Sequence, residues 1–304
     1  MPIGGFYGAA MMRLVVLLAM FGGASSNVIG IDFGTELIKV ALVQPGSPLE
    51  IVTNTISKRK TEACISFDRG DRMFGADAFG LLSRKPQFTY AKMTTLLGRT
   101  ADHASVKALS AQHFPTEVYF NETRGGLCVK SPADYWTPEE LTAMILSHVK
   151  DITKAFGGKL VRDCVITVPM YFTQHERAAL LDAAEIADMR VLSLIDENTA
   201  AALQYSLDRV FEEPQNVLFF NMGSQSTQVS IVQYSSQTVK ELGKNKTLGQ
   251  FEVVGKGWDG ELGGVHFDML LTELLAVCGR RFFTHPARFT VLSPRRTSTF
   301  PQFV

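Results

Sequence analysis

One stretch of the chain occurs twice, and this repeat constrains the fold more than any other feature. Residues 28–43, which begin VIGIDFGT, match residues 217–232, which begin VLFFNMGS, without a gap. In both copies we expect a buried strand, then a turn, and then a second strand. The turn consists of Asp or Asn, any residue, Gly, and Thr or Ser. Two such hairpins predict a duplicated domain whose halves face each other across a cleft. A chance match is the alternative, because strand patterns are easily matched.

The segments outside the hairpins alternate between strand and helix patterns. Two of the helices begin at capping boxes, in which a threonine is followed three residues later by a glutamate. Such alternation predicts an α/β domain with layered sheets. The predicted elements are a helix from the box at Thr137 to Gly157, a strand at 164–168, a helix from the box at Thr173 to about Ala187, a strand at 191–195, and a helix capped by Asn198.

The balance of charge removes one class of partner. Lys plus Arg number 30 and Asp plus Glu number 30, so the formal net charge is zero. Because nucleic-acid binding depends on a basic surface that neutralises phosphates, nucleic acid is not an expected partner. The 46% of hydrophobic residues fits a globular protein with a core of its own.

The N-terminus has the pattern of a secretory signal peptide. Arg13 precedes an apolar run at 14–21, and small residues follow up to Ser26. The run is too short for a membrane span, which needs about 20 apolar residues, and no other stretch resembles a span. We therefore expect residues 1–26 to be a signal peptide for the endoplasmic reticulum, with a buried first strand or helix as the alternative. The sequons at Asn121 and Asn245 then predict a glycoprotein.

Both repeated hairpins contain a turn that suits phosphate binding. Glycine lets an anion approach the backbone closely, and the neighbouring hydroxyl adds a hydrogen-bond donor. Asp32, beside the first turn, is a carboxylate able to hold Mg²⁺ or its water shell. Two such turns on one cleft would clamp the phosphates of a nucleotide from both sides. A third glycine-rich segment, residues 255–264, is either a flexible loop or a phosphate-proximal loop at a helix N-terminus.

Several segments together resemble the heat-shock-70 chaperone family. They follow the order expected for that family, which makes the resemblance highly specific. The four main ones are GIDFGT at 30–35, VITVPMYF at 165–172, LIDENTAAA at 194–202 and LGGVHFD at 262–268. Those at 45–52, 57–61 and 222–227 further resemble the large endoplasmic-reticulum branch of the family.

The resemblance implies a fold and a site. The fold is the actin-like ATPase fold, an α/β nucleotide-binding domain of two ribonuclease-H-like lobes around a cleft for ATP or ADP with Mg²⁺. Asp32 would hold the metal ion through water, and Glu197 would help to position the attacking water. The nucleotide-binding residues that it implies are Gly34, Thr35, Glu36, Gly223, Ser224, Ser226, Gly263 and Gly264.

The chain departs from the family at its charged positions. Asn221 and Gln228 stand where the family has carboxylates, and amides can neither neutralise Mg²⁺ nor accept a proton. The family's catalytic lysine corresponds to Thr94. Lys92, two positions earlier, would keep the same face of a strand and is the candidate substitute. Because phosphoryl transfer depends on positioning and charge stabilisation, we expect ATP binding with weak or absent hydrolysis.

The resemblance also predicts the domain organisation. A signal peptide at 1–26 is followed by the first lobe at 27–214 and by the start of the second lobe at 215–278. The last helix is expected to end near Leu275, and residues 279–304 are expected to be a disordered tail unlike the family. The domain would then be incomplete at its C-terminal end and expose an unpaired apolar face.

The expected function is that of an ATP-binding molecular chaperone of the endoplasmic reticulum lumen. It would assist protein folding under stress, with unfolded proteins and the lumenal heat-shock-70 chaperone as partners, the latter through co-chaperone or nucleotide-exchange activity. One alternative is an inert truncated product or a non-hydrolysing nucleotide-binding module. A sugar kinase of the same fold is less favoured, because it would need the carboxylate that Asn221 replaces.

Overall fold

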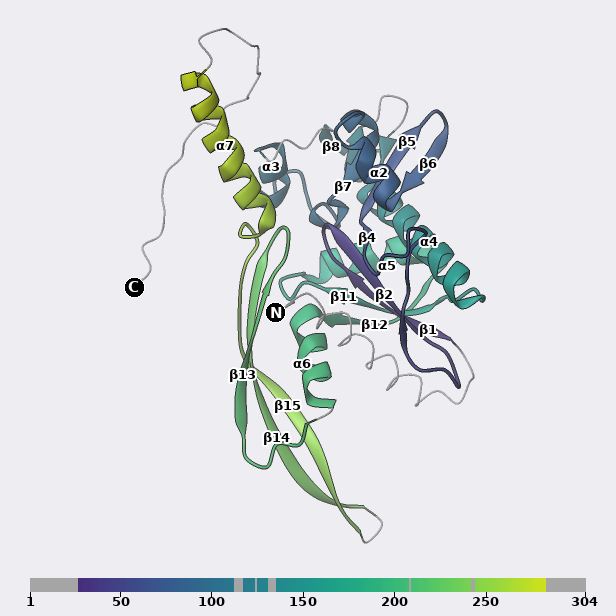
Figure 1. Ribbon diagram of the computed structural model, residues 1–304, viewed down its shortest axis with the longest axis vertical. Helices are drawn as coiled ribbons and strands as arrows, with labels where there is room; N and C mark the ends of the chain where they lie inside the picture. The colour runs from purple at the N-terminus through teal and green to yellow at the C-terminus, as the bar shows by residue number, and fades with distance from the viewer. Residues whose placement is uncertain are drawn as a thin grey trace.

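The computed structural model describes residues 27–111, 117–123, 125–130, 135–207, 209–241 and 244–282. The predicted signal peptide and most of the predicted tail lie outside these residues. The first lobe holds strands β1 to β12, and the second lobe holds a long three-stranded ribbon and a projecting helix (Figure 1). Helix α6, Glu197–Leu207, lies between the two lobes.

A six-stranded sheet organises the first lobe. Its order is β12-β11-β1-β2-β3, and β4 also pairs with β2. The central strands β1, β11 and β12 are parallel, whereas β2 is antiparallel to β1. Parallel central strands joined through helices are the arrangement that the alternating sequence pattern predicts. The strands are β1 Val28–Phe33, β2 Leu37–Val43, β3 Glu50–Ile51, β4 Thr61–Glu62, β11 Asp163–Val168 and β12 Arg190–Asp196.

Two small antiparallel sheets complete the first lobe. One has the order β6-β5-β7 and the other the order β10-β9-β8. Short helices lie between β6 and β7 and between the two small sheets. The elements are β5 Cys64–Asp68, β6 Asp71–Phe74, α2 Gly75–Leu81, η2 Pro86–Phe88, β7 Thr89–Ala91, η3 Met93–Thr95, α3 Ala104–Ala111, β8 Val118–Asn121, β9 Gly126–Lys130 and β10 Tyr135–Trp136.

Both predicted capping boxes are present. Helix α4, Pro138–Gly157, begins after Thr137, whose Oγ1 accepts a hydrogen bond of 3.1 Å from the Glu140 N–H. It ends at Gly158, which has a φ of 73°, a left-handed conformation that favours glycine. Helix α5, Gln174–Ile186, begins after Thr173 in the same way. The sequence therefore predicted both helices correctly.

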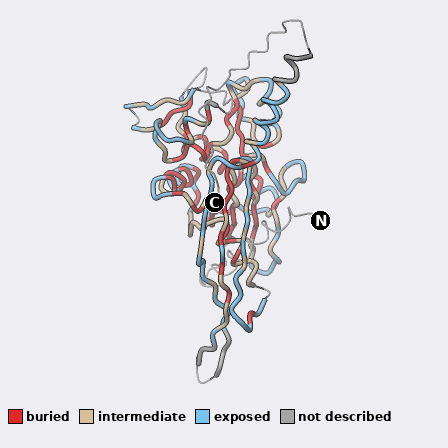
Figure 2. The backbone as a smooth tube through the Cα atoms, turned by 90° about the vertical axis from the view of Figure 1, so that its left-hand side faces the viewer, coloured by how far each residue is buried: buried red, intermediate tan, exposed pale blue. Residues whose placement is uncertain are grey.

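The main core lies between the six-stranded sheet and helices α4 and α5. Because successive side chains alternate in a strand, Ile29, Ile31 and Phe33 of β1 enter this core, and Asp32 belongs to the opposite face. Leu146 and Leu180 are buried in the same core. Figure 2 shows buried residues gathered in the first lobe. The strand alternation thus leaves Asp32 on the face of the sheet away from the main core.

The second lobe has a much smaller core. Strands β13 Gln215–Met222, β14 Thr227–Glu241 and β15 Lys244–Asp259 form an antiparallel ribbon. Helix α6 packs on it through Tyr234, whose hydroxyl donates a hydrogen bond of 2.8 Å to the Ala202 carbonyl. The Tyr234 ring stacks on Phe211 with a centroid distance of 4.6 Å. These contacts join the first lobe to the ribbon.

The internal repeat is confirmed by strand register. In the β1–β2 hairpin Val28 pairs with Val43, and in the β13–β14 hairpin Val217 pairs with Val232. The pairing continues in step to the turns. The corresponding pairs beside the two turns are Asp32 with Lys39 and Asn221 with Gln228.

Three local predictions differ from the structure. Strand β13 is not buried, because the ribbon is covered by α6 on one side only. Asn198 does not cap α6, which begins at Glu197; its buried amide instead donates to Ser230 Oγ at 3.2 Å. Helix α7, Gly264–Phe282, continues past the predicted end near Leu275.

An apolar surface is exposed on the second lobe, as the sequence predicts. Helix α7 projects away from the body of the protein, which leaves its apolar residues uncovered (Figure 1). None of the helices in the described ranges is both long and apolar enough to cross a membrane. The exposed residues on β13 and α7 are Leu218 60%, Phe220 54%, Met222 43%, Phe267 55%, Leu270 64%, Leu271 53%, Leu274 60% and Leu275 60%.

Candidate functional site

A cleft of about 730 Å³ lies where the two repeated turns approach each other. It is bounded by the ends of β1 and β11, the start of α6, and the turn between β13 and β14. Most of the residues that the resemblance implies as nucleotide-binding or catalytic therefore line one space. These are Asp32, Gly34, Thr35, Glu36, Glu197, Gly223, Ser224 and Ser226.

The parallel strands explain why the predicted site residues gather in this cleft. Asp32 and Thr167 lie at the carboxyl ends of β1 and β11, and Glu197 directly follows β12. In open α/β sheets, ligands bind at this edge of the strands. A second hollow of about 690 Å³ lies at the opposite edge, where Arg190 and Asp163 form an ion pair of 2.5 Å. The carboxyl-end cleft is therefore the candidate site.

Asp32 is fixed by two side chains. The ammonium of Lys39, its neighbour across the hairpin, lies 2.5 Å from Oδ2. The hydroxyl of Thr167 donates to Oδ1 at 3.2 Å and accepts a hydrogen bond of 3.2 Å from the Phe33 N–H. Both oxygens of the Asp32 carboxylate thus have partners within the protein.

Glu197 faces two amides of the second hairpin. Asn221 Nδ2 and Gln228 Nε2 each donate a hydrogen bond of 2.8 Å to Glu197 Oε2. The Met170 N–H donates at 2.8 Å to Gln228 Oε1, which turns the Gln228 NH₂ group toward Glu197. These bonds connect the first lobe to the second at the centre of the cleft.

The environment of Glu197 changes its acidity. Desolvation raises the pKa of Glu197 from an ordinary value of 4.5 to about 7, and the nearby negative charge of Asp32 acts in the same direction. The hydrogen bonds from Gln228 and Asn221 oppose this rise, as does the positive charge of Lys39. A carboxyl group with this pKa is partly protonated near neutral pH.

The two turns have polar groups directed at the cleft. In the first, the Thr94 hydroxyl donates to the Thr35 hydroxyl at 3.1 Å. A Cβ on Gly34 would lie 2.7 Å from the Leu37 carbonyl oxygen, so this position accepts only glycine. In the second turn, the Tyr171 hydroxyl donates to Ser226 Oγ at 3.1 Å.

Gly263 and Gly264 support the second turn and do not line the cleft. A Cβ on Gly263 would lie 2.6 Å from the Ser224 carbonyl oxygen. The Gly264 N–H donates to the Gly223 carbonyl at 3.0 Å, and the Val265 N–H donates to the Ser224 carbonyl at 2.9 Å. The third glycine-rich segment thus reaches the site through the backbone of the second turn.

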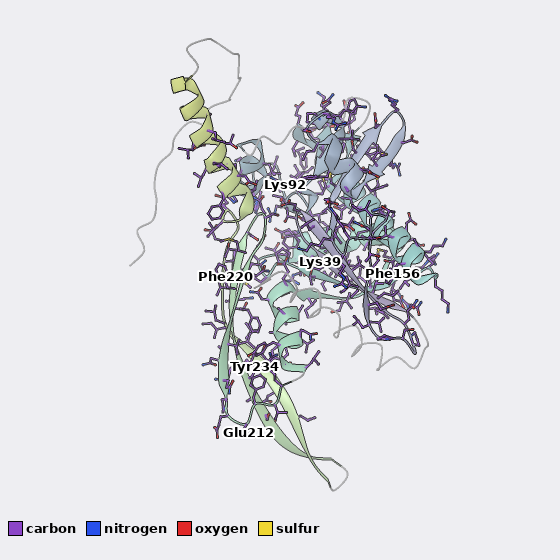
Figure 3. All side chains as sticks on the ribbon, viewed as in Figure 1. Lys39, Lys92, Phe156, Glu212, Phe220 and Tyr234 are labelled. Carbon is purple, nitrogen blue, oxygen red and sulfur yellow. The ribbon has the colours of Figure 1, made fainter. Side chains whose placement is uncertain are left out.

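Lys92 lies outside the residues that line the cleft. Strand β7 ends at Ala91, and Lys92 has a left-handed φ of 60°, so the expectation that it keeps a strand face is wrong. Burial lowers the pKa of Lys92, and the carboxylates of Glu36 and Asp268 act in the opposite direction. Figure 3 shows Lys92 toward the foot of α7, apart from Lys39. Thr94 holds the position beside Thr35.

Lys39 is a charged residue of the cleft that sequence reasoning did not name. It lines the cleft and forms an ion pair with Asp32. The hairpin register could have placed Lys39 beside Asp32, because residues opposite each other in an antiparallel pair share one face of the sheet. Asp32 and Lys39 bracket the first turn in the same way as Asn221 and Gln228 bracket the second.

The donor groups do not fit a resident magnesium ion. Mg²⁺ prefers anionic oxygen ligands, but the Asp32 carboxylate is already paired with an ammonium. Asn221 and Gln228 contribute neutral amides. Within the described parts of the chain, no group of three or more His, Cys, Asp or Glu side chains is placed to hold a metal ion.

Comparison with known proteins defines the class. The family model for Hsp70 protein matches residues 28–280, so the chain belongs to the Hsp70 family. This confirms the predicted α/β, actin-like ATPase fold of the nucleotide-binding domain. The match extends slightly past the predicted end of the second lobe at residue 278.

The similar curated proteins are forms of hypoxia up-regulated protein 1. That of Danio rerio is 40% identical over 272 residues, which are 88% of this chain and 27% of the relative. That of Xenopus tropicalis is 38% identical over 277 residues, 88% of this chain and 43% of the relative. The Homo sapiens protein is 36% identical over 269 residues, 86% and 27% respectively. The chain thus spans less than half the length of these relatives.

Proposed function

We propose that this chain is a nucleotide-binding chaperone module that holds ATP or ADP and hydrolyses ATP slowly or not at all. The observation that carries this proposal is the convergence of the two repeated turns on one cleft, with Glu197 hydrogen-bonded to amides at its centre. Such a module would bind ATP or ADP but would not convert ATP to ADP rapidly.

The two turns are the proposed phosphate clamp. Gly34, Thr35 and Glu36 would contact phosphates from the first lobe. Ser224 and Ser226 would contact them from the second, because backbone N–H groups and hydroxyls of tight turns suit anions. Gly223 would allow close approach, and Gly263 and Gly264 would keep the second turn in place.

Weak hydrolysis is proposed because Thr94, Asn221 and Gln228 stand where the resemblance implies charged groups. Phosphoryl transfer relies on positioned cations and on a group that orients the attacking water. Thr94 replaces the family's lysine, and Lys92 lies outside the cleft. Glu197 would be the water-orienting group, but one of its oxygens already accepts two hydrogen bonds. The same substitutions count against a sugar kinase.

The cellular role is proposed from the family. The relatives' name, hypoxia up-regulated protein 1, supports a part in the stress response. Together with the N-terminal pattern of residues 1–26, it supports a location in the endoplasmic reticulum lumen. Unfolded proteins and the lumenal heat-shock-70 chaperone are the proposed partners, the latter through nucleotide exchange. Residues 27–214 and 215–278 would form the two lobes, and residues 279–304 a tail.

A thermal melt of the purified chain with and without excess ATP and Mg²⁺ tests nucleotide binding. Ligand at about 100 times its dissociation constant adds roughly 2.7 kcal/mol of stability, which raises the melting temperature. A Cβ at Gly223 has room, its nearest neighbour being the Ser226 carbonyl oxygen at 3.5 Å, so Gly223→Ala should fold and show a smaller shift. The matched control is Gly249→Ala, on the exposed ribbon. A cooperative melt that nucleotide does not shift contradicts the proposal and favours the inert product.

A further inference from the structure

The cleft contains a resident positive charge at the place where a metal ion would be expected. Lys39 Nζ lies 2.5 Å from Asp32 Oδ2, and the side chains of Lys39 and Asp32 are 24% and 17% exposed. Both residues line the cleft together with Thr35 and Ser224. The ammonium is therefore held between a carboxylate and the space that the phosphates would enter.

We propose that Lys39 takes the place of the magnesium ion, so that this chain binds the phosphates of a nucleotide without a metal ion. This inference rests on the proposed nucleotide binding and specifies its chemistry. The ligand class is a free nucleoside di- or triphosphate, and its metal complex is not required.

The hairpin register makes the replacement possible. Because Lys39 is the direct cross-strand partner of Asp32, its side chain leaves the sheet on the same face and reaches the carboxylate without leaving β2. The equivalent positions of the second hairpin, Asn221 and Gln228, are neutral and point their amides at Glu197. None of these four positions thus presents a carboxylate that lacks a partner to a cation.

An ammonium group is chemically suited to replace the magnesium ion. A lysine ammonium is a compact charge with three N–H donors, and one of them suffices for Asp32. The other donors are left for phosphate oxygens that arrive through the cleft. A dication that approached Asp32 would meet this like charge at contact distance, whereas an anionic phosphate would be attracted. The site therefore selects the phosphate over the metal ion.

The first experiment needs no variant. ATP binding to the purified chain is measured by isothermal titration calorimetry in excess Mg²⁺ and again in excess EDTA. We expect the two dissociation constants to agree within about twofold. Affinity that falls about tenfold or more in EDTA overturns the inference but leaves the proposed nucleotide binding intact. No binding in either buffer overturns both.

The second experiment uses Lys39→Met, which keeps the length of the side chain and removes its charge. Its ATP affinity should fall about tenfold or more in EDTA and recover in part with Mg²⁺, because Asp32 is then free for a metal ion. The matched control is Lys60→Met, since Lys60 also lines the cleft and is exposed. Its affinity should change by the same factor in both buffers.

A third readout uses a metal ion alone. Mn²⁺, a spectroscopic substitute for Mg²⁺, is titrated into nucleotide-free protein and followed by electron paramagnetic resonance. Lys39→Met should bind Mn²⁺ at least about tenfold more tightly than the unaltered chain. Equal Mn²⁺ binding by the two proteins overturns the inference. Should Lys39→Met lose its cooperative melt, the comparison of Mg²⁺ with EDTA on the unaltered chain decides alone.

Discussion

Gln228 Nε2 donates a hydrogen bond of 2.8 Å to Glu197 Oε2 and so joins the second repeated hairpin to the first residue of α6. The same glutamine accepts from the Met170 N–H at 2.8 Å. One amide side chain therefore bridges the two lobes and occupies Glu197 Oε2, an oxygen of the proposed water-orienting group. The resemblance implies a negatively charged carboxylate at position 228. The neutral Gln228 amide instead connects the two lobes by hydrogen bonds.

The acidity of Glu197 should make folding stability depend on pH. Its folded pKa is about 7, against an ordinary value of 4.5. The stabilising effect of the protonated form is complete below pH 4.5. As pH rises further, the unfolded chain ionises first, so the folded state loses stability until about pH 7. Between pH 4.5 and about pH 7, the free energy of unfolding of the unaltered chain should fall by about 3 kcal/mol relative to that of Glu197→Gln. Urea unfolding at several pH values measures this difference.

The control for this prediction is Glu212→Gln, which changes an exposed carboxylate. The difference between this variant and the unaltered chain should not vary over the same pH interval. A constant difference between Glu197→Gln and the unaltered chain would show that the Glu197 carboxyl is not desolvated.

The bridge made by Gln228 should contribute to stability. Gln228→Met keeps the approximate shape but removes both hydrogen bonds, leaving the buried Met170 N–H without its partner. We expect a loss of about 1–3 kcal/mol in the free energy of unfolding, measured by chemical denaturation. Gln233→Met, at a half-buried position on the other face of the same strand, should change stability by less than about 0.5 kcal/mol. Equal losses in the two variants would contradict the bridging role.

Gly263 should be required for the shape of the second turn. A Cβ in Gly263→Ala would lie 2.6 Å from the Ser224 carbonyl oxygen and 2.7 Å from the Gln225 N, so the backbone of the turn must move. We expect lower thermal stability and a smaller stabilisation by ATP. The control is Gly257→Ala, where a Cβ meets nothing within 4 Å. If Gly263→Ala retains the full ATP shift, the glycine does not support the phosphate clamp.

The sequon at Asn121 tests passage through the secretory pathway. It lies at the turn between β8 and β9, where Asn121 Oδ1 accepts a hydrogen bond of 3.0 Å from the Thr123 N–H. Protein expressed with its own N-terminus in secretory cells should lose a glycan in Asn121→Gln, seen as faster electrophoretic mobility. Thr123→Ala, which keeps the asparagine, should lose the same glycan. Unchanged mobility in both variants would contradict modification at this site.

Local sequence patterns predicted much of the fold because their physics is local. The capping boxes at Thr137 and Thr173 satisfy N–H groups within one turn of helix, so their residues specify the helix start. The register of the repeated hairpins follows from the strand pattern and the shared turn. The main sheet and the two turns of the cleft could therefore be anticipated.

The missed features depend on contacts between distant segments. Asn198 has the residue type of a helix cap, but a partner 32 positions away, Ser230, uses its amide inside the core. Lys92 does not continue strand β7 because its backbone adopts a left-handed conformation. Lysine is not a residue type that predicts this conformation. The close approach of the Ser224 backbone to Gly263, 39 positions further along the chain, is likewise invisible in the local sequence. Among these missed features, only the position of Lys39 could have been predicted, because its pairing with Asp32 follows from the hairpin register.

The most direct test of the account is the chemical identity of bound nucleotide. The purified chain is incubated with labelled ATP, separated rapidly from free nucleotide, denatured, and analysed for ATP and ADP over several hours. We expect near-stoichiometric bound nucleotide that remains ATP, because the two turns would clamp it while Thr94, Asn221 and Gln228 stand where the resemblance implies charged groups. Bound nucleotide recovered as ADP within minutes, or no bound nucleotide, would contradict this expectation.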